Sequence, residues 1–470
     1  MSDELEDLVL DWSAYRDSGF GDPYADIPKH GEDFAKAVSV CINSMQCLRP
    51  IERGVMCPSF RVTGNPDHSP GGRVRLLKEA LNSSQPQKAL FSPDLQESMA
   101  LCVSCKGCKR ECDSNVDMAS IKSEYIAQTA SPVLPLREKF FASLPQLLNE
   151  HKRIIIPFIE FRNRSRFVSF LGERLFRVSG KKQLPVPAKQ SFYESYEPNA
   201  SVYRRFSEQA NYSETDNDLP LEHKKVLLMI DTFSNYFDPS VARSATNVLK
   251  YLGYEVYIHS PHNSINDQPL CCGRTYYSNG DMDNARSEAK RLLKGLAPMI
   301  ESGVPIIGLE PSCLLMLRDE YKTMNLGPMA EQASKLAFLF EEFLAKEFTT
   351  GRIQRTFEEA SDDKPVLVHG HCHQKSVGAM KSLRKVLRLV PKLKFDFIES
   401  TCCGGAGSFS FQSENHDISE KMAELSLMPA IRSAENSILV SNGFSCRCQI
   451  SDLTNKSSNH IATLLERYIG

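Results

Sequence analysis

Cysteines are the residues of this 470-residue chain whose number and spacing are best suited to chemistry. Fifteen are too few for a disulfide-rich scaffold, and the acidic start MSDELEDLVLDW lacks the features of a secretory signal. We therefore expect a cytoplasmic protein whose thiols bind metal or act in catalysis. They fall into three groups: Cys41, Cys47 and Cys57; Cys102, Cys105, Cys108 and Cys112; and Cys271, Cys272, Cys313, Cys372, Cys402, Cys403, Cys446 and Cys448.

The second group has the spacing C-x2-C-x2-C-x3-C, in the stretch CVSCKGCKREC. In bacterial ferredoxins such a run gives three ligands to one [4Fe-4S] cluster and its fourth cysteine to a second cluster. We therefore expect Cys102, Cys105 and Cys108 to hold one cluster, with Cys57, which precedes Pro58, as the fourth ligand. Zinc is the alternative for four closely spaced cysteines, but the repeated two-residue spacing favours iron–sulfur.

A second cluster has three thiolates in the sequence: Cys41, Cys47 and Cys112. Ser44 stands where a two-cluster ferredoxin has its middle cysteine. We expect either a [3Fe-4S] cluster or a [4Fe-4S] cluster with a fourth ligand that the sequence does not name. Cys112 is expected to begin the next helix and to point away from the first cluster.

Three basic residues, Lys106, Lys109 and Arg110, follow the first cluster's ligands closely. Positive charge near an anionic cluster would raise its reduction potential, whereas solvated surface side chains would have little effect. Gly107 is expected to let the backbone approach the cluster closely.

The third group contains two CCG turns, in PLCCGR and STCCGGAG. A disulfide between adjacent cysteines is a poor explanation, because neighbouring Cα atoms lie only about 3.8 Å apart. Cys372, Cys402, Cys403, Cys446 and Cys448 make the second half of this region the better metal site. The first half offers Cys271, Cys272 and Cys313, with Thr232 aligned opposite Cys372.

Histidines and glycines surround the second pair. The glycines Gly404, Gly405 and Gly407 allow a tight turn beside a bulky cofactor. A mixed Cys and His zinc site competes with an iron–sulfur cluster here, because His369, His371 and His373 flank Cys372.

The elements that must position these cysteines can be inferred from apolar spacing. Helices are predicted over 71–81 and 116–128, and each CCG half is predicted as strand, helix, strand, CCG turn, helix, strand and cysteine. This alternation predicts parallel sheets with flanking helices, with the cysteines at the carboxyl ends of the strands and the two turns converging at one edge. We expect an α+β multidomain protein: an N-terminal extension (1–35), a helical ferredoxin-type two-cluster module (36–130), a basic helical segment and linker (131–221), and two CCG repeats (222–330 and 331–470).

The segment between the modules is basic. From Lys152 to Lys189 it has ten Lys or Arg residues and only Glu160 and Glu173 as acids. Helical spacing of Phe161, Leu171 and Leu175 predicts an amphipathic helix that ends before Pro185, and residues 194–221 are predicted to be a linker. Such a helix either touches a membrane surface or a partner, or packs on its own domain with a solvated basic face.

The stretches CVSCKGCKRECDSNVDM and MCPSFRVTGNPDHSPGGR resemble the ferredoxin-type domain of the iron–sulfur subunits and halves of FAD-linked 2-hydroxyacid oxidoreductases, of the D-lactate, D-2-hydroxyglutarate, glycolate-oxidase and anaerobic glycerol-3-phosphate types. The CCG pair resembles the cysteine-rich domain of heterodisulfide reductase, where it binds a noncubane [4Fe-4S] cluster. Here 29 residues separate Cys372 from the pair, 42 separate Cys403 from Cys446, and the last pair is C-x-C where that pattern has C-x2-C. A noncubane cluster and zinc therefore both stay open for this site.

The resemblance implies an electron-transfer subunit that passes electrons from a separate FAD-binding dehydrogenase subunit to a quinone, a cytochrome or another acceptor. The alternatives are a disulfide reductase that works at the CCG centre and a zinc-stabilised scaffold. A net charge of −2 gives no indication of nucleic-acid binding. The sequence shows no membrane-spanning run, and the basic segment leaves open a peripheral place on the cytoplasmic face of the membrane.

Overall fold

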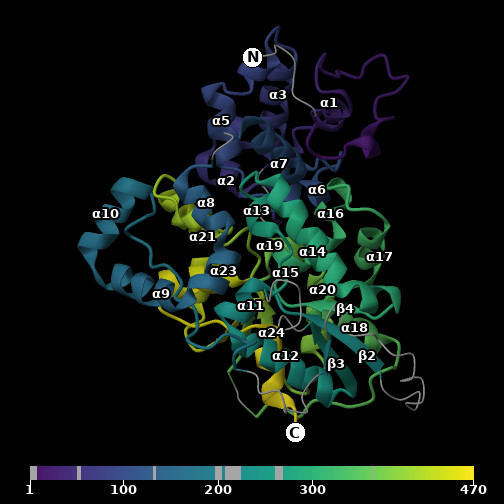
Figure 1. Ribbon diagram of the computed structural model, residues 1–470, viewed down its shortest axis with the longest axis vertical. Coiled ribbons are helices and arrows are strands. Elements are labelled where there is room, and N and C mark those ends of the chain that lie inside the picture. The colour runs from purple at the N-terminus through teal and green to yellow at the C-terminus, as the bar shows by residue number, and fades with distance from the viewer. Residues whose placement is uncertain are drawn as a thin grey trace.

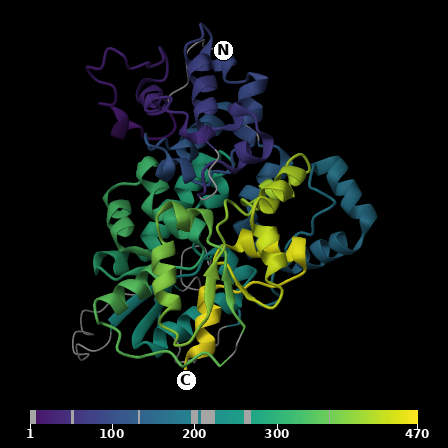
Figure 2. The same ribbon diagram turned by 180° about the vertical axis from the view of Figure 1, so that it is seen from behind.

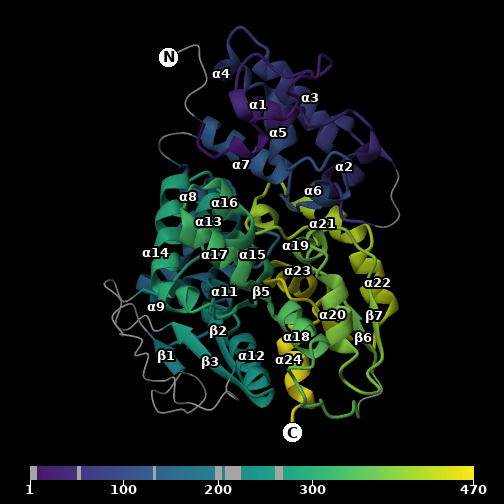
Figure 3. The same cartoon turned by 90° about the vertical axis from the view of Figure 1, so that its right-hand side faces the viewer.

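The computed structural model describes residues 8–49, 54–130, 134–195, 204–206, 224–259, 268–361 and 364–470. A helical N-terminal module lies above two α/β repeats that stand side by side (Figure 3). The α+β architecture with parallel sheets is the predicted one. No helix within the described ranges is long and apolar enough to cross a membrane.

Short helices build the N-terminal module. Proline at the first position starts four of them, where its missing N–H costs no hydrogen bond. The side chains of Ser69 and Asp117 cap the two longest, which confirms the helices predicted over 71–81 and 116–128. The helices are α1 (Glu32–Ser39), α2 (Pro58–Thr63), α3 (Pro70–Leu81), α4 (Pro86–Ala89), α5 (Pro93–Ala100), α6 (Gly107–Glu111) and α7 (Met118–Thr129).

The described part of the N-terminal extension is bound to this module. The buried carboxylate of Glu124 on α7 accepts hydrogen bonds from the backbone N–H groups of Val9 and Leu10, at 2.9 and 2.8 Å, and from Trp12 Nε1 at 3.1 Å. Three donors satisfy a carboxylate that would otherwise be costly to bury. Residues 8–12 therefore belong structurally to the module that they precede.

The first repeat contains a five-stranded parallel sheet in the order β1-β3-β2-β4-β5. Strand β2 ends in the buried apolar run VLLM, typical of a strand that is covered on both faces. The strands are β1 (Arg204–Phe206), β2 (Lys224–Met229), β3 (Tyr254–His259), β4 (Ile306–Gly308) and β5 (Ala337–Leu339), and the helices are α11 (Thr232–Tyr236), α12 (Pro239–Tyr251), α13 (Arg274–Tyr277), α14 (Met282–Glu301), α15 (Pro311–Arg318), α16 (Glu320–Thr323) and α17 (Pro328–Leu336).

The second repeat has a smaller parallel sheet in the order β7-β6-β8. This order reproduces the central β3-β2-β4 of the first sheet, so the predicted duplication is present in the strand topology. The strands are β6 (Val366–Val368), β7 (Phe395–Phe397) and β8 (Ile438–Val440), and the helices are α18 (Phe340–Thr349), α19 (Cys372–Ser376), α20 (Met380–Leu387), α21 (His416–Glu424), α22 (Leu427–Ser433), α23 (Phe444–Thr454) and α24 (Ile461–Leu465).

One hydrophobic core joins the two repeats. It contains Val226 and Ile307 from the first sheet together with Val366 and Val440 from the second. The boundary expected at residue 330 falls inside α17, and β5 still pairs with β4 of the first sheet. The domain limits themselves stay predictions.

Helices α8 (Leu136–Ala142), α9 (Leu144–Arg164) and α10 (Arg166–Phe176) connect the two modules. Helices α9 and α10 stand out from the body at one edge of the molecule (Figures 1 and 2). The predicted single amphipathic helix is broken at Ser165, whose side chain caps α10. Strand β1 lies inside the predicted linker, and residues 196–203 and 207–221 of that linker fall outside the described residues.

Candidate metal centres

The four cysteines predicted to hold the first cluster surround one cavity. Cys57, Cys102, Cys105 and Cys108 are all buried and all line it. The loops reach this arrangement through non-glycine residues in the left-handed region: φ is +32° at Cys57 and +60° at Lys106. Such backbone strain is uncommon and concentrates at sites where function imposes a conformation.

Arg73 is a charged residue of this site that the sequence did not single out. Its guanidinium is fully buried and donates hydrogen bonds to Cys57 Sγ at 3.4 Å, to Ser59 Oγ at 3.0 Å and to the carbonyl of Ser98 at 2.9 Å. Burial raises the pKa of the Cys102 thiol, but the charges of Arg73 and Lys122 outweigh it and lower that pKa overall. A buried cation among four thiols fits an anionic cluster bound by thiolates.

Two of the positive charges expected near this cluster form ion pairs with carboxylates of the first CCG repeat. Lys106 is 5% exposed and pairs with Asp319 at 2.6 Å and Glu320 at 2.8 Å, both in the first CCG repeat. Lys109 also pairs with Asp319, at 2.6 Å. Carboxylates pair with both lysines where the two modules meet, so the alternative of solvated surface lysines does not describe Lys106, and the expected effect on the reduction potential stays a prediction.

Gly107 and Arg110, the other two residues singled out beside this cluster, make contacts between segments of the chain. A Cβ atom on Gly107 would lie 2.9 Å from the backbone nitrogen of Met56, so the glycine permits contact with the loop before Cys57. Arg110 Nη1 donates a long hydrogen bond, at 3.5 Å, to the carbonyl of Ser376 in the second repeat. Both residues serve packing between segments.

The second predicted set, Cys41, Cys47 and Cys112, also comes together. Burial raises the pKa of the Cys41 thiol, and the nearby Cys112 and Cys47 raise it further. A Cβ atom on Gly71 would lie 3.2 Å from Cys47 Sγ, so glycine makes room for the thiol there. Cys112 ends α6 and precedes α7 by several residues, so the expectation that it begins a helix is wrong.

The thiols of the second repeat form a continuous buried group. Cys372 is the first residue of α19, Cys402 and Cys403 lie in the turn after β7, and Cys446 lies in α23 after β8. The Sγ atoms of Cys403 and Cys446 are 3.2 Å apart, and hydrogen bonding with Cys402 lowers the pKa of the Cys372 thiol. Cys448, on the same helix, is half-buried beside them.

Glycine is required at this turn. Gly404 has φ +80°, and a Cβ atom there would lie 2.2 Å from the carbonyl oxygen of Ser419. The N–H groups of Gly404 and Gly405 each donate a hydrogen bond, at 3.4 Å, to Cys402 Sγ and Cys403 Sγ respectively. N–H donors stabilise thiolates, so the turn favours the metal-binding form of both cysteines.

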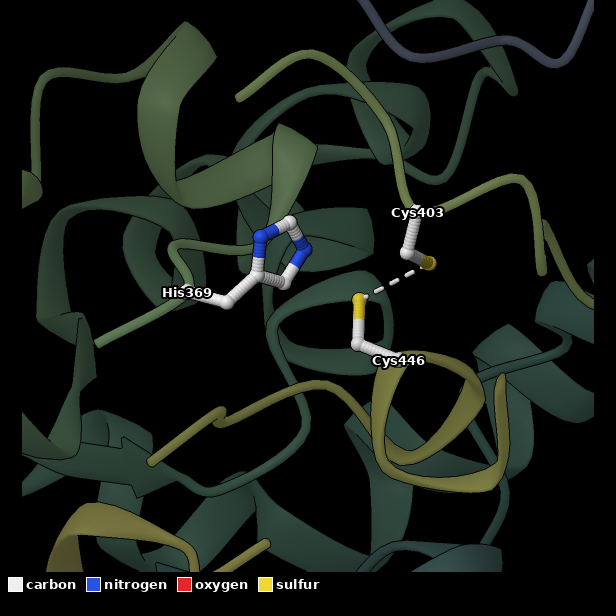
Figure 4. Close-up of side chains that lie close together, drawn as sticks. All are labelled: His369, Cys403 and Cys446. Atoms are coloured by element: carbon white, nitrogen blue, oxygen red, sulfur yellow. Dashed lines mark hydrogen bonds between the residues drawn. The ribbon is translucent and has the colours of Figure 1, made fainter. Parts of the chain in front are cut away.

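Histidines close the same site. A ring nitrogen of His369 lies within 4.8 Å of the Sγ atoms of Cys403 and Cys446 (Figure 4). Its Nδ1 is 2.8 Å from Ser400 Oγ, which holds the ring. His373 is buried beside Cys372, and neither of its ring nitrogens makes a hydrogen bond of regular geometry to a described residue. His371 caps α19 through Nδ1 and stacks on His373, so it positions the helix.

The first repeat repeats this geometry with fewer ligands. Thr232 Oγ1 donates to Cys271 Sγ at 3.8 Å, as Cys372 contacts Cys402 in the second repeat. Cys272 contacts Cys313, as Cys403 contacts Cys446. Across the described residues, the compact groups of three metal ligands lie in the second repeat. The alignment of Thr232 with Cys372 is consistent with these contacts.

Two of the predicted sites adjoin each other. Cys105 of the N-terminal module shares a small buried cluster with Cys372, Cys402, Cys403 and Cys446. Burial raises the pKa of Cys105, and the charge of Cys372 is the next largest cause.

The two repeats also meet at their cysteine-bearing ends. Glu310 accepts a hydrogen bond from the Phe444 N–H at 2.7 Å, which places the sites of both repeats at one edge, as expected.

A cavity of about 580 Å³ extends from this junction. Its wall carries the cysteines of the second repeat and Cys102 of the N-terminal module. Aromatic side chains supply much of the remaining wall: Phe140, Phe141, Phe233, Phe409, Phe411 and Phe444. An apolar molecule with a flat ring fits such a lining.

Comparisons with known proteins agree with these sites. The 4Fe-4S dicluster domain pattern matches residues 37–116, and the cysteine-rich domain pattern matches residues 232–318 and 366–451. Escherichia coli (strain K12) D-2-hydroxyglutarate dehydrogenase is 23% identical over 466 residues, which cover 91% of this chain and 43% of that protein. The chain thus spans less than half the length of this relative.

Two relatives of more similar length are described as subunits. One subunit of the anaerobic glycerol-3-phosphate dehydrogenase of Escherichia coli (strain K12) is 24% identical over 336 residues, or 70% of this chain and 77% of that protein. The glycolate oxidase iron-sulfur subunit of the same strain is 21% identical over 424 residues, or 87% of this chain and 90% of that protein. The chain therefore joins a region that matches a 4Fe-4S dicluster domain to two copies of a cysteine-rich domain.

Proposed function

We propose that this chain is the electron-transfer subunit of a 2-hydroxyacid oxidoreductase. It would accept electrons from an FAD-containing dehydrogenase subunit and pass them to a quinone, a cytochrome or another acceptor. The observation that carries this proposal is the contiguity of Cys105 with the thiols of the second repeat in one buried cluster. Two sites for metal centres that share a dry boundary suit the transfer of electrons between modules.

The donor sets fit iron–sulfur clusters. Cys57, Cys102, Cys105 and Cys108 would hold one [4Fe-4S] cluster, and Cys41, Cys47 and Cys112 would hold a second cluster of three or four irons. The thiols of the second repeat would hold a third centre, which we propose to be a noncubane [4Fe-4S] cluster. When bound, such clusters supply one-electron redox chemistry.

The protein's own groups set the conditions for that chemistry. Arg73 places a buried positive charge among the first four thiols, and the N–H groups of Gly404 and Gly405 point at the paired cysteines. Both devices stabilise added negative charge and so favour the reduced state. Cys57, Cys105 and Cys108 are buried, which limits the access of water to the first cluster site.

The relatives support the dehydrogenase partner. Two that match this chain over most of their length are named as a dehydrogenase subunit and as an iron-sulfur subunit. The D-2-hydroxyglutarate dehydrogenase, in contrast, has more than half of its length outside the matched region. We propose that a flavin-binding dehydrogenase acts with this chain and oxidises the hydroxyacid.

The aromatic cavity supports an apolar electron acceptor. Its wall includes Cys402 and Cys403 on one side and phenylalanines on others. A quinone has the flat ring and apolar surface that this lining accommodates. The cavity would bring it beside the third centre.

A zinc-stabilised second repeat is the other candidate, because His369, Cys403 and Cys446 form a compact mixed ligand set. In that case electrons would reach the N-terminal module only, and the second repeat would be structural. Iron, acid-labile sulfide and zinc analysis of anaerobically purified protein separates the two, with about twelve irons expected for three clusters and about eight with one zinc for the alternative.

Anaerobic mixing tests the proposal itself. The purified chain is combined with the flavoprotein subunit and its hydroxyacid, and cluster absorbance and electron paramagnetic resonance are followed. We expect reduction of the iron–sulfur signals when hydroxyacid is present and none when it is omitted. Clusters that stay oxidised while the flavin becomes reduced would refute the proposal.

A further inference from the structure

Helices α9 and α10 form an arm (residues 144–176) whose apolar side chains face outward. Phe158, Phe161, Phe167 and Phe170 are 62%, 61%, 73% and 63% exposed. Ile154 and Leu175 are 70% and 62% exposed on the same two helices. A group of large apolar side chains this exposed is rare on a monomeric protein and marks an interaction surface.

Polar groups of the arm and the segment after it face inward instead. Lys152 is buried and pairs with Glu194. Arg162 is buried and donates a hydrogen bond to the carbonyl of Lys182 at 2.5 Å. Lys182 in turn is 3% exposed and lies 3.4 Å from Asp452 of the second repeat. The arm is thus held to the body of the protein through buried basic side chains, together with Leu148 and Ile159, while its large exposed apolar side chains stay uncovered.

Positive charge surrounds the exposed phenylalanines. Five arginines of the arm and its C-terminal cap have exposed side chains: Arg153, Arg164, Arg166, Arg174 and Arg177. Between residues 152 and 189 the acids are Glu160 and Glu173, and both are half-buried. Aromatic and aliphatic side chains interspersed with arginine characterise helices that lie in the interface of an anionic bilayer.

We propose that this arm docks the protein on an anionic phospholipid surface. The phenylalanines would enter the boundary between headgroups and acyl chains, and the arginines would contact lipid phosphates. A second copy of the chain is a poorer occupant, because a two-fold contact would set the same arginine-rich surface against itself. The fixed position of the arm, held through Arg162 and Lys182, makes the surface preformed.

The arm also adjoins the aromatic cavity. Ile159 of α9, together with Leu184 and Pro185 after the arm, lines that cavity. Docking through the outer face of the arm would therefore bring the cavity close to the bilayer. A lipid-soluble acceptor could then pass from the bilayer into the cavity over a short distance through water.

Vesicle flotation with the full-length holoprotein tests the docking surface. We expect binding to vesicles of phosphatidylcholine mixed with an equal amount of phosphatidylglycerol, and weaker binding to phosphatidylcholine alone. Added salt should weaken binding to the anionic vesicles, because it screens the arginines. Absence of binding to the anionic vesicles would overturn the proposal.

Two pairs of substitutions locate the surface. Phe167→Ser with Phe170→Ser should lower the partition coefficient about tenfold or more, because two apolar side chains no longer enter the bilayer. Phe20→Ser is the matched control, since Phe20 is 89% exposed in the N-terminal extension, and it should bind as the wild type does. Equal binding by the arm variant and the control would contradict the proposal.

The contribution of the arginines to vesicle binding is tested with a separate pair of substitutions and its own control. Arg164→Glu with Arg166→Glu should remove most of the preference for anionic vesicles, whereas Arg388→Glu, on an exposed residue of the second repeat, should not. Sedimentation velocity without lipid tests the other occupant: a dimer that Phe167→Ser with Phe170→Ser dissociates, combined with no vesicle binding, would assign the arm to a second copy and overturn the lipid proposal. Vesicle binding requires no cluster reduction, so its outcome is independent of the proposed electron transfer.

Discussion

The two cysteine-rich repeats share one scaffold but differ in what their strand ends carry. Both have the same central strand order, a left-handed glycine after the paired cysteines and a cysteine in the helix that follows β4 or β8. The second repeat has Cys372 where the first has Thr232, and the first lacks a counterpart of Cys448. The second repeat thus has a complete ligand set, and the first has a partial one.

The two repeats also contact the N-terminal module through different groups. The second repeat meets it through thiols, with Cys105 beside Cys372. The first repeat meets it through ion pairs of Lys106 and Lys109 with Asp319 and Glu320. Duplication has produced one copy suited to hold a metal centre and another suited to fix the module that must lie next to that centre.

The largest expected effect comes from removing a thiol in each repeat. Cys403→Ser should remove the metal centre of the second repeat, which lowers the iron content by about four per chain for a cluster. Cys272→Ser should leave the metal content unchanged, because its repeat lacks the fourth ligand. Metal analysis of the two variants provides the comparison, and equal losses would show that the first repeat also binds metal.

Breaking the ion pairs tests the docking role of the first repeat. Lys106→Met leaves half-buried Asp319 and buried Glu320 with fewer partners, so we expect the free energy of unfolding to fall by about 3 kcal/mol. Lys36→Met removes a partly exposed pair with Asp33 and should cost about 0.5 kcal/mol or less. Urea unfolding at neutral pH measures both, and similar small losses would contradict the docking role.

The pH dependence of this pair has a defined sign. Burial alone would raise the pKa of Asp319, but the charges of Lys106 and Lys109 outweigh it and lower that pKa below its ordinary value of 3.8. The stabilisation is therefore fully present above about pH 4 and is lost as the pH falls through the lowered pKa. Between pH 5 and pH 8 the difference between wild type and Lys106→Met should stay constant.

A smaller effect is expected inside the second repeat, where α18 contacts α19 and the segment after β8. The buried carboxylate of Glu341 accepts hydrogen bonds from Gln374 Nε2 and, at 3.1 Å, from Asn442 Nδ2. Burial raises its pKa from 4.5 to about 7, so the folded protein keeps a proton that the unfolded chain loses in this window. Stability should fall as the pH rises from about 4.5 to 7, by on the order of 3 kcal/mol in total.

Glu341→Gln removes this titration. The variant should show a flatter dependence of unfolding free energy on pH between pH 5 and pH 7 than the wild type. The same slope in both proteins would show that protonation of Glu341 does not contribute to the stability of the fold.

The smallest expected effect is a gain. Thr232→Cys adds a fourth thiol next to Cys271, where Thr232 Oγ1 now lies 3.8 Å from the sulfur. Zinc titration should then detect about one additional ion per chain, since four thiolates suffice for a structural zinc site. Thr246→Cys, which adds a buried thiol in α12, is the control and should bind no additional zinc. If neither variant binds additional zinc, the two repeats share their backbone fold but not the geometry of a metal site.

Local patterns predicted much of this molecule. The C-x2-C-x2-C-x3-C run, the helices over 71–81 and 116–128, and the order of elements in each repeat all depend on short-range spacing and turn residues, which the sequence displays directly. The same locality explains why Thr232 could be aligned with Cys372. Both residues follow the first strand of their repeats.

Contacts between residues far apart in the sequence could not be predicted from local patterns. Lys106 pairs with Asp319, a residue 213 positions later, and nothing near Lys106 in the sequence indicates this partner. Arg73 lies in a predicted helix, and its burial beside Cys57 depends on how separate segments pack. The sequence left two alternatives for the arm for a related reason: periodicity finds an apolar face but does not indicate which side the protein body occupies.

The central claim is that the N-terminal cluster site and the second repeat act as one electron path through Cys105 and Cys372. Electron paramagnetic resonance of the reduced wild type and of Cys403→Ser tests it most directly. The account predicts a signal broadened by magnetic coupling between neighbouring centres in the wild type, and a simple uncoupled signal from the N-terminal clusters in the variant. Identical uncoupled spectra from both proteins would contradict it.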